Sequence, residues 1–255
     1  MNVEYYIIDP IGNITALVTS DIDKSMYKTV AQMIMRNNSS VEQVGFVRFN
    51  GESITLNMSG DEFCGNATMS AAVLFYSKFI INGVFKVNVN ILPFNISVPV
   101  EVKNAGDYYN CSAVLPEPKQ VFDYTFSVGN KNYCFPAVSF SGITHIVADS
   151  TLSDDCAKTV IKDLALDLKT RALGIMVSDN KTGNLKPFVY VAGIDTLYLE
   201  NSCASGSCAI AFLQKEYNKK YDIVQPGGII GAMKLNSGIR LDTKIKIKEH
   251  YTKEM

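Results

Sequence analysis

The sequence contains few of the residues that build metal and cofactor sites. Only two of its 255 residues are histidines, His145 and His250, and no two of its six cysteines form a Cys-x-x-Cys pair. Structural zinc sites usually draw on such pairs and on histidine, so we expect no metal. No lysine lies in a context that resembles a pyridoxal-phosphate site, and we therefore expect no cofactor.

The sequence also has no large excess of positive or negative charge and no long apolar run. The net charge is −1, and the basic stretch KIKIKEHYTKE alternates with apolar and acidic residues, which argues against binding to nucleic acid or to an anionic membrane. No apolar run approaches the ~20 residues of a membrane span, and the first residues lack the basic start and apolar core of a signal peptide. We expect a cytoplasmic protein whose six thiols are free.

What the sequence does have is an ordinary globular composition, 47% apolar and 19% charged. Segments rich in β-branched and aromatic residues, such as VEYYIID and LKPFVYVAG, dominate and predict strands. Amphipathic spacing predicts helices at 23–36 and 153–168, the second capped by Ser153 or Asp154. A chain of this length forms one large domain or two of about 125 residues.

Two further helices follow cysteines in similar surroundings. The stretches are DEFCGNATMSAA at 61–72, which contains Cys64, and ENSCASGSCAIA at 200–211, which contains Cys203. Both helices lack a polar stripe, and a helix that is apolar all round is buried. We therefore predict an α+β fold of two pseudo-symmetric halves, each a mixed sheet wrapped around a central buried helix. Two prolines in LPEPKQ place the division at 1–118 and 119–255, and the last strand is a candidate to pack back on the N-terminal half.

A cysteine at the start of a helix lies beside unpaired N–H groups and a positive dipole end. Both favour the thiolate, so we expect a lowered thiol pKa at Cys64 and Cys203. Small residues there, Gly65, Ser205 and Gly206, let the N–H groups approach an anion such as a carboxylate. Two facing thiols suit inversion of a carbon, because one removes the α-proton while the other delivers a proton to the opposite face.

Simpler interpretations of the cysteines stand beside this one. Free cysteine is often a small buried hydrophobe, which is what we expect of Cys111, Cys134, Cys156 and Cys208. Cys64 and Cys203 could also form a disulfide, which would be an oxidised, inactive form of the pair. A non-enzymatic amino-acid-binding protein would use the same cleft without needing either thiol.

At these two cysteines the sequence resembles the diaminopimelate epimerase family. The resemblance lies in CGNAT at 64–68, in CASGS at 203–207 with Ala204 in place of a glycine, and in Gly12-Asn13, GITHIV and QPGG elsewhere. It spans nearly the whole chain. It implies a cofactor-independent isomerase with the diaminopimelate epimerase-like fold, a small-molecule amino-acid substrate and a homodimer.

Within that family the phrases EQVGF, MSGDEFCGNATMS and ENSCASGS resemble the histidine racemases of staphylopine-type metallophore biosynthesis. Diaminopimelate epimerases bind the far end of their substrate with asparagines where this chain has Ile143 and Ala172, and with a Glu-Arg pair that is missing here. The resemblance thus implies interconversion of L- and D-histidine. Diaminopimelate epimerase or another amino-acid racemase of this fold is the alternative, and a proline racemase ranks lower because its sequence after the first cysteine differs.

The resemblance also implies roles for individual residues. Cys64 and Cys203 are the acid–base pair, and the N–H groups of Gly65, Asn66, Ser205 and Gly206 hold the α-carboxylate. Asn13 and Asn57 contact the α-amino or carboxylate group, unless they are ordinary turn residues. Glu42 and Gln43 are candidates to bind an imidazole, unless they form the polar face of a strand. His145 is a partner behind the site or a satisfied core histidine, and Glu200 orients the loop before Cys203 or caps the helix.

Overall fold

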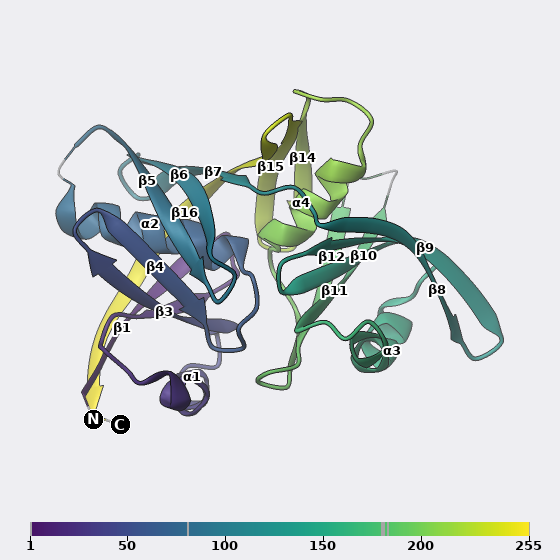
Figure 1. The fold of residues 1–255 in the computed structure, drawn as a ribbon, viewed down its shortest axis with the longest axis horizontal. Helices are drawn as coiled ribbons and strands as arrows, with labels where there is room; N and C mark the ends of the chain where they lie inside the picture. Colours follow the sequence, from purple (N-terminus) through teal and green to yellow (C-terminus); the bar gives the residue numbers. More distant parts are fainter. Residues whose placement is uncertain (1, 81, 180–181, 183, 255) are drawn as a thin grey trace.

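A computed structural model describes residues 2–80, 82–179, 182 and 184–254. Its described part is α+β, as predicted, with strands far outnumbering helices (Figure 1). The strands are β1 (Asn2–Pro10), β2 (Thr15–Val18), β3 (Gln43–Asn50), β4 (Ser53–Met58), β5 (Val84–Leu92), β6 (Ile96–Asn104), β7 (Tyr109–Leu115), β8 (Gln120–Val128), β9 (Lys131–Phe140), β10 (Ile143–Asp149), β11 (Ala172–Asp179), β12 (Asn184–Val191), β13 (Thr196–Leu199), β14 (Lys220–Gln225), β15 (Gly228–Leu235) and β16 (Gly238–Glu254). The helices are a 3-10 turn (Lys24–Met26), α1 (Tyr27–Asn37), α2 (Gly65–Phe79), α3 (Asp154–Asp167) and α4 (Ala204–Leu213).

The first seven strands and the last one close into a ring around α2. Neighbouring strands pair in the order β1-β2-β3-β4-β5-β6-β7-β16, and β16 also pairs with β1. The long β16 makes this closure possible, because its residues 239–245 pair with β7 and its residues 245–254 pair with β1. The last strand therefore packs on the N-terminal strands, and both chain ends lie side by side (Figure 1).

The remaining strands continue the same sheet in the order β16-β15-β14-β12-β11-β10-β9-β8 and curve around α4, with β13 beside β12. Parallel pairs occur at corresponding places in the two parts: β2 with β3 and β4 with β5, then β10 with β11 and β12 with β14. Each of these pairs is joined through a helix, as parallel strands require. The order of strands and helices is thus repeated along the chain.

The two central helices are buried because neither has a polar face. Every residue of α2 from 65 to 76 is buried, and so are most residues of α4. Both helices belong to one continuous apolar core. In the described part of the chain, no helix is long and apolar enough to cross a membrane.

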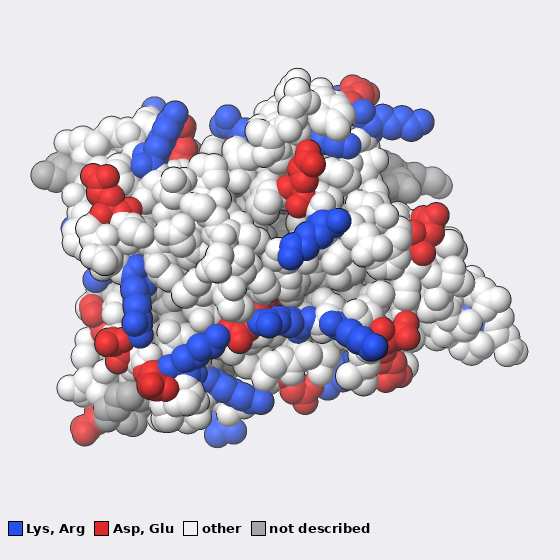
Figure 2. Space-filling view, in the orientation of Figure 1, with Lys and Arg blue, Asp and Glu red and all other residues white. Residues whose placement is uncertain are grey.

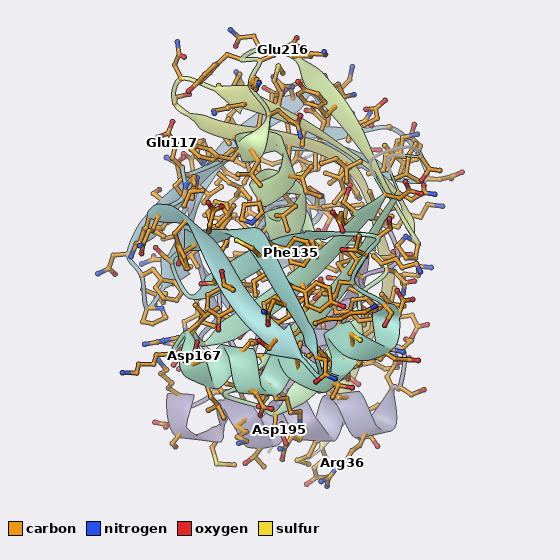
Figure 3. All side chains as sticks on the ribbon, turned by 90° about the vertical axis from the view of Figure 1, so that its right-hand side faces the viewer. Arg36, Glu117, Phe135, Asp167, Asp195 and Glu216 are labelled. Atoms are coloured by element: carbon orange, nitrogen blue, oxygen red, sulfur yellow. The ribbon has the colours of Figure 1, made fainter. Side chains whose placement is uncertain are left out.

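The amphipathic helices α1 and α3 lie on the outside of the sheet instead. α1 covers β1–β3 with Val30, Ala31 and Ile34, and α3 covers β9–β12. Figure 3 shows both helices on the same side of the molecule, with Arg36 near the end of α1 and Asp167 at the end of α3. Of the two predicted caps for α3, Ser153 is the residue used, and its Oγ accepts from the N–H of Cys156 at 3.2 Å.

The face of the molecule seen in Figure 2 carries basic and acidic side chains intermixed over both halves, in keeping with the net charge of −1. All six cysteines are free. The expectation that four of them are buried is correct for Cys111 and Cys208 but wrong for Cys134, which is exposed, while Cys156 is half-buried. The reason at Cys134 is the alternation of β9, in which Tyr133 and Phe135 face inward and Cys134 faces outward.

Candidate active site

Cys64 and Cys203 occupy equivalent positions directly before the two central helices. The backbone angles are φ −128° and ψ 109° at Cys64, and φ −128° and ψ 106° at Cys203. This extended conformation is typical of an N-cap residue and places the side chain beside the free N–H groups of the first turn. The Sγ of Cys64 accepts from one of them, the N–H of Ala67, at 3.3 Å.

The N-terminal ends of α2 and α4 touch each other. A Cβ atom on Gly65 would lie 2.9 Å from the Cβ of Ala204 and 3.7 Å from the backbone nitrogen of Ser205. The helices can meet this closely only because Gly65 has no side chain. Two cysteines from distant parts of the chain therefore flank a single helix-to-helix contact.

Both cysteines line one small cavity at this contact. Its volume is about 30 Å³, roughly the share of one water molecule in the liquid. Three carboxylates also line it, those of Glu42, Glu62 and Glu200, and so do apolar side chains from β10 and β12. The cavity is too small for an amino acid, so a substrate enters only when side chains or the two halves move apart.

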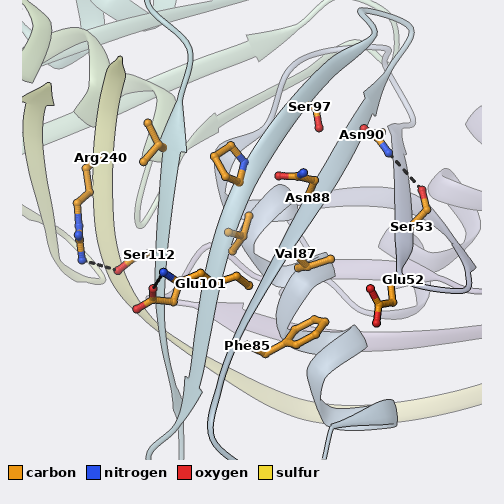
Figure 4. A pocket seen from close by; sticks show the side chains of 14 residues that line it. Glu52, Ser53, Phe85, Val87, Asn88, Asn90, Ser97, Glu101, Ser112 and Arg240 are labelled. Carbon is orange, nitrogen blue, oxygen red and sulfur yellow. Dashed lines mark hydrogen bonds and ion pairs between the residues drawn. The ribbon is translucent and has the colours of Figure 1, made fainter. Parts of the chain in front are cut away.

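A much larger hollow lies elsewhere, on the outer face of β5, β6, β7 and β16 (Figure 4). It measures about 640 Å³, and Arg240, which lines it, is already paired with Asp242 and donates to Ser112. Cysteine and histidine are not among the described residues that line it. The size of this hollow therefore does not make it the reactive site, whereas the thiols and carboxylates of the smaller cavity provide groups that can move protons.

Side chains from β3 and from the turn after β1 hold Cys64. The Cys64 thiol donates to Oε1 of Gln43 at 3.0 Å, and Nε2 of Gln43 donates to Thr15 Oγ1 at 2.7 Å and to Asn13 Oδ1. Nδ2 of Asn13 in turn donates to Oε2 of Glu42 at 2.6 Å. These contacts fix the positions of Glu42 and Gln43, the two adjacent polar residues where the otherwise largely apolar β3 begins.

Asn66, in the first turn of α2, links the two halves. Its Nδ2 donates to Oδ1 of Asn13 at 3.0 Å and to the carbonyl oxygen of Ser202 at 2.9 Å. Its Oδ1 is buried without a hydrogen-bond partner. A buried acceptor of this kind costs about 1–3 kcal/mol when unpaired, which makes it a place where a ligand N–H group would be stabilised.

A second set of contacts holds Cys203. Its backbone N–H donates to Oε1 of Gln225 at 2.6 Å, and its Sγ lies 3.7 Å from Oγ of Ser205. The Ser205 hydroxyl pairs with Nε2 of His145 at 2.9 Å. His145 is completely buried, and burial lowers its pKa to about 3, so it is a neutral partner behind Ser205.

The cavity raises rather than lowers the pKa of both thiols, which corrects the expectation drawn from the helix ends. Burial is the main cause at each sulfur, and the charge of Glu200 adds to it. The nearby backbone N–H groups act in the opposite direction but are outweighed. Burial in the cavity therefore favours the neutral thiol at both cysteines.

The carboxylates share this environment. Burial raises the pKa of Glu200 to about 8, with the charge of Glu42 as the next cause, while the nearby side chains of Cys203 and Asn13 act in the opposite direction. Burial also raises the pKa of Glu62 to about 7 and, in the same direction, the pKa of Glu42. These are groups whose protons can move near neutral pH.

The structure places the residues predicted from sequence in two layers. The cavity wall includes Cys64, Cys203, Glu42, Gln43, Gly65, Asn66, Ser205 and Glu200. Asn13 and His145 lie behind it and hold wall residues, and Gly206 lies one residue beyond Ser205 in α4. Asn57 is outside the wall, because its Nδ2 is used by the following loop, where it donates to Asp61 Oδ1 at 2.8 Å.

Three site residues were missed by sequence reasoning. Glu62 and Tyr198 line the cavity, and Gln225 holds the N–H of Cys203. Gln225 belongs to the QPGG motif, from which its place in the site could have been predicted. Glu62 lies two residues before Cys64, in a segment where only the cysteine was considered. Tyr198 gave no signal, since one more aromatic residue in a strand is ordinary. In the described part of the chain, no group of three or more His, Cys, Asp and Glu residues is arranged to hold a metal ion.

Comparison with solved structures shows the fold. Over 99% of both chains, the protein superposes on a predicted epimerase from Pseudomonas aeruginosa with a TM-score of 0.69 and 9% identity. It also superposes on a hydroxyproline epimerase from Agrobacterium vitis with a TM-score of 0.67 and 9% identity, over 98% of this chain and 92% of the other. At this level of identity the likeness concerns the fold alone.

Comparison of sequences shows the family. The sequence profile described as "Histidine racemase CntK N-terminal domain" matches residues 2–252. A histidine racemase of Fusobacterium nucleatum is 30% identical over 249 residues, which are 94% of this chain and 92% of that protein. A histidine racemase of Staphylococcus aureus is 29% identical over 242 residues, or 89% and 87% of the two chains. The chain belongs to the histidine racemase family of isomerases.

Proposed function

We propose that the protein interconverts L- and D-histidine by a two-cysteine acid–base mechanism that needs no cofactor. The observation that carries the proposal is the pair of cysteines from the two halves, which line one cavity at the meeting point of two helix N-termini. Histidine as the substrate rests on the family to which the chain belongs.

In this mechanism the thiols act on opposite faces of the substrate α-carbon. One sulfur, as thiolate, removes the α-proton, and the other, as thiol, delivers a proton from the far side. The roles exchange in the reverse direction. General acid–base catalysis of this kind contributes roughly 10²- to 10⁴-fold, so positioning and charge stabilisation must supply the rest.

The helix ends provide the charge stabilisation. Free N–H groups of the first turns, at Gly65, Asn66, Ser205 and Gly206, are placed to hold the α-carboxylate and the charge that spreads into it during proton removal. The unpaired Oδ1 of Asn66 suits the α-ammonium group. Asn13 positions the wall residues Glu42 and Gln43.

Thiol ionisation is the step that burial opposes, because it raises both thiol pKa values. An entering substrate brings a positive ammonium group, which favours a thiolate close to it. At Cys203 the carboxylate of Glu200 can also take up the thiol proton, since its own pKa is raised to about 8. Substrate binding and activation of the thiol are thereby coupled.

Incubation of the wild-type protein with single L-amino acids in D₂O, followed by chiral separation and proton NMR, tests the proposal. L-Histidine should yield D-histidine with deuterium at the α-carbon, without added cofactor or metal. Conversion of diaminopimelate but not histidine would assign the chain the alternative activity. Ile143, which lines the cavity where diaminopimelate epimerases have an asparagine, argues against that alternative.

We also propose the following organisation. The two repeats correspond to 1–118 and 119–255, with β16 shared, and form a fold of the diaminopimelate epimerase type; the repeated order of strands and helices supports this. A homodimer and a cytoplasmic location follow from the resemblance and from the six free thiols. Light scattering of the purified protein tests the dimer.

A further inference from the structure

The three carboxylates that line the cavity differ in how many hydrogen bonds their oxygens accept from the protein. Both oxygens of Glu42 accept hydrogen bonds, from Asn13 at 2.6 Å and from Asn201 at 2.9 Å. Glu200 is half-buried and lies near Cys203 and Asn13. Oε2 of Glu62, by contrast, is buried without a partner, and the residue is only 4% exposed. Among the described acidic residues that line the cavity, only Glu62 has a fully buried oxygen that lacks a partner.

Glu62 lies where the loop between β4 and α2 meets the turn between β12 and β13. A Cβ atom on Gly60 would be 2.5 Å from Cγ1 of Val191 and 2.6 Å from Oε2 of Glu62. A Cβ atom on Gly193 would be 3.0 Å from the carbonyl oxygen of Gly60. The free oxygen is thus held by close packing at the seam between the two halves.

The wall around this oxygen suits a flat ring. Ile143, Val189, Val191 and Ile194 line the cavity with apolar surface, and Tyr198 adds an aromatic ring. None of the described lining residues is Lys, Arg or His, so no protein cation competes for the carboxylate. Apolar surface beside a buried acceptor without a partner matches an aromatic ring that carries an N–H group.

The remaining polar groups of the substrate have other partners in the proposed reaction. The helix ends take the α-carboxylate, and Asn66, whose Oδ1 is free, lines the cavity together with both cysteines. Oε2 of Glu62 lies beside Gly60, which packs against Val191 and the β12–β13 turn. The group left to meet Glu62 is the substrate side chain.

We propose that Glu62 determines substrate specificity by accepting the ring N–H of the substrate side chain. This rests on the proposed function and deepens it, because it names the residue that separates imidazole from rings of the same size without an N–H. Burial raises the pKa of the Glu62 carboxyl to about 7, near the ordinary value of an imidazole, so the two groups are well matched to share a proton.

The test compares two substrates in three proteins. L-Histidine and 3-(2-thienyl)-L-alanine have five-membered rings, but the thiophene ring has no N–H. The variants are E62M, which keeps the length of the side chain but removes its oxygens, and E52Q, a control at an exposed glutamate outside the cavity. Racemisation is followed by chiral chromatography to give kcat and KM for each pair.

Wild-type protein should prefer histidine. E62M should raise KM for histidine about tenfold, the usual cost of leaving one buried hydrogen bond unmade, with a smaller change in kcat and no loss on thienylalanine. E52Q should match the wild type on both substrates. If E62M is poorly folded by thermal unfolding, E62L, which also has no oxygen to accept an N–H group, replaces it and should show the same loss confined to histidine.

Three outcomes overturn the inference. Equal losses on both substrates would mean that Glu62 acts on the cysteines or on the α-ammonium group rather than on the ring. Unchanged KM for histidine in a folded variant would mean that the ring N–H has another partner. If the wild type used both substrates equally well, the protein would still be a racemase but would lack the proposed specificity. If the wild type racemised neither substrate, the proposed function itself would be wrong.

Discussion

The two cysteines share one backbone geometry but not one chemical environment. Cys64 is half-buried and donates its thiol to the neutral amide oxygen of Gln43. Cys203 is 4% exposed and lies beside the Glu200 carboxylate and the Ser205 hydroxyl. The repeated scaffold therefore fixes where each sulfur lies, while neighbours that are not repeated decide how easily each one loses its proton.

This difference has a chemical meaning for the proposed reaction. In the proposed reaction the Glu200 carboxylate, whose pKa burial raises to about 8, can take up the proton of Cys203, whereas the amide of Gln43 accepts a hydrogen bond from Cys64 but cannot take its proton. In the proposed reaction, two unequal thiols would thus carry out a symmetric task, in which one proton is removed from one face of the α-carbon and another is delivered to the opposite face.

The largest effect is expected from replacing either sulfur. C64S or C203S should abolish racemisation, because a serine hydroxyl is far too weak a base at neutral pH, while the similar side-chain size preserves the fold. Each variant retains one thiol, so slow α-proton exchange should survive for one enantiomer, and for opposite enantiomers in the two variants. Proton NMR of L- and D-histidine in D₂O measures both. Near-normal racemisation by either variant, or the same preferred enantiomer in both, would contradict the two-face mechanism.

A smaller loss is expected when only the neighbour of Cys203 is changed. E200Q removes the proton acceptor and should slow the Cys203-dependent exchange on the order of 10²-fold, the lower end of general-base effects. The exchange carried by Cys64 should change much less. The measurement uses E200Q in the C64S and C203S backgrounds, with E216Q at an exposed glutamate after α4 as control. Equal slowing in both backgrounds would show that Glu200 serves the whole cavity.

The contact between the two helices offers a test of stability. G65A places a methyl group 2.9 Å from the Cβ of Ala204 and should lower the free energy of unfolding by about 1–3 kcal/mol, the usual cost of overpacking. Removing the opposing methyl group in G65A/A204G should restore part of this loss. Urea unfolding of both variants and of A204G alone gives the coupling energy. If the effects of the two single substitutions on the free energy of unfolding were strictly additive, the two helix ends would not be in close contact.

The smallest expected effect concerns pH and only the Cys203 side. His145 has a pKa of about 3 in the folded protein, below its ordinary value of 6.5, because burial disfavours its charged form. Its contribution to stability is therefore complete above pH 6.5 and is lost as the pH falls towards 3. H145Q should flatten this part of the curve of unfolding free energy against pH. An unchanged slope would assign the acid sensitivity to other groups.

The sequence predicted the scaffold well because the relevant signals are local. Apolar residues on every side of α2 and α4 required both helices to be buried, and β-branched segments marked strands around them. The α+β class and the helices at 23–36 and 153–168 are confirmed within a few residues at their ends. The ring closed by β16 was foreseen only as a possible return of the last strand, because strand pairing across the whole chain leaves no mark in a local pattern.

The site was less predictable, since burial depends on the assembled halves. A helix N-terminus alone lowers a thiol pKa, but the cavity that forms around Cys64 and Cys203 reverses the direction. Glu62 was overlooked because only the packing of Gly60 against Val191 makes its carboxylate a wall residue. Asn57 was included because of the resemblance, while its amide group is occupied by Asp61 in the next loop.

The pairing of the last strand with the first has a consequence for biosynthesis. Asn2 is opposite Glu254 and Pro10 is opposite Ile245, so the ribosome makes β16 long after its partner β1. Until residues 238–254 emerge, β1 and β7 each lack the neighbour that closes the ring around α2. Unpaired strand edges readily pair with other chains, so a nascent chain that stalls before residue 238 exposes two strand edges that can pair with another chain, although the other strands of the ring have already been synthesised.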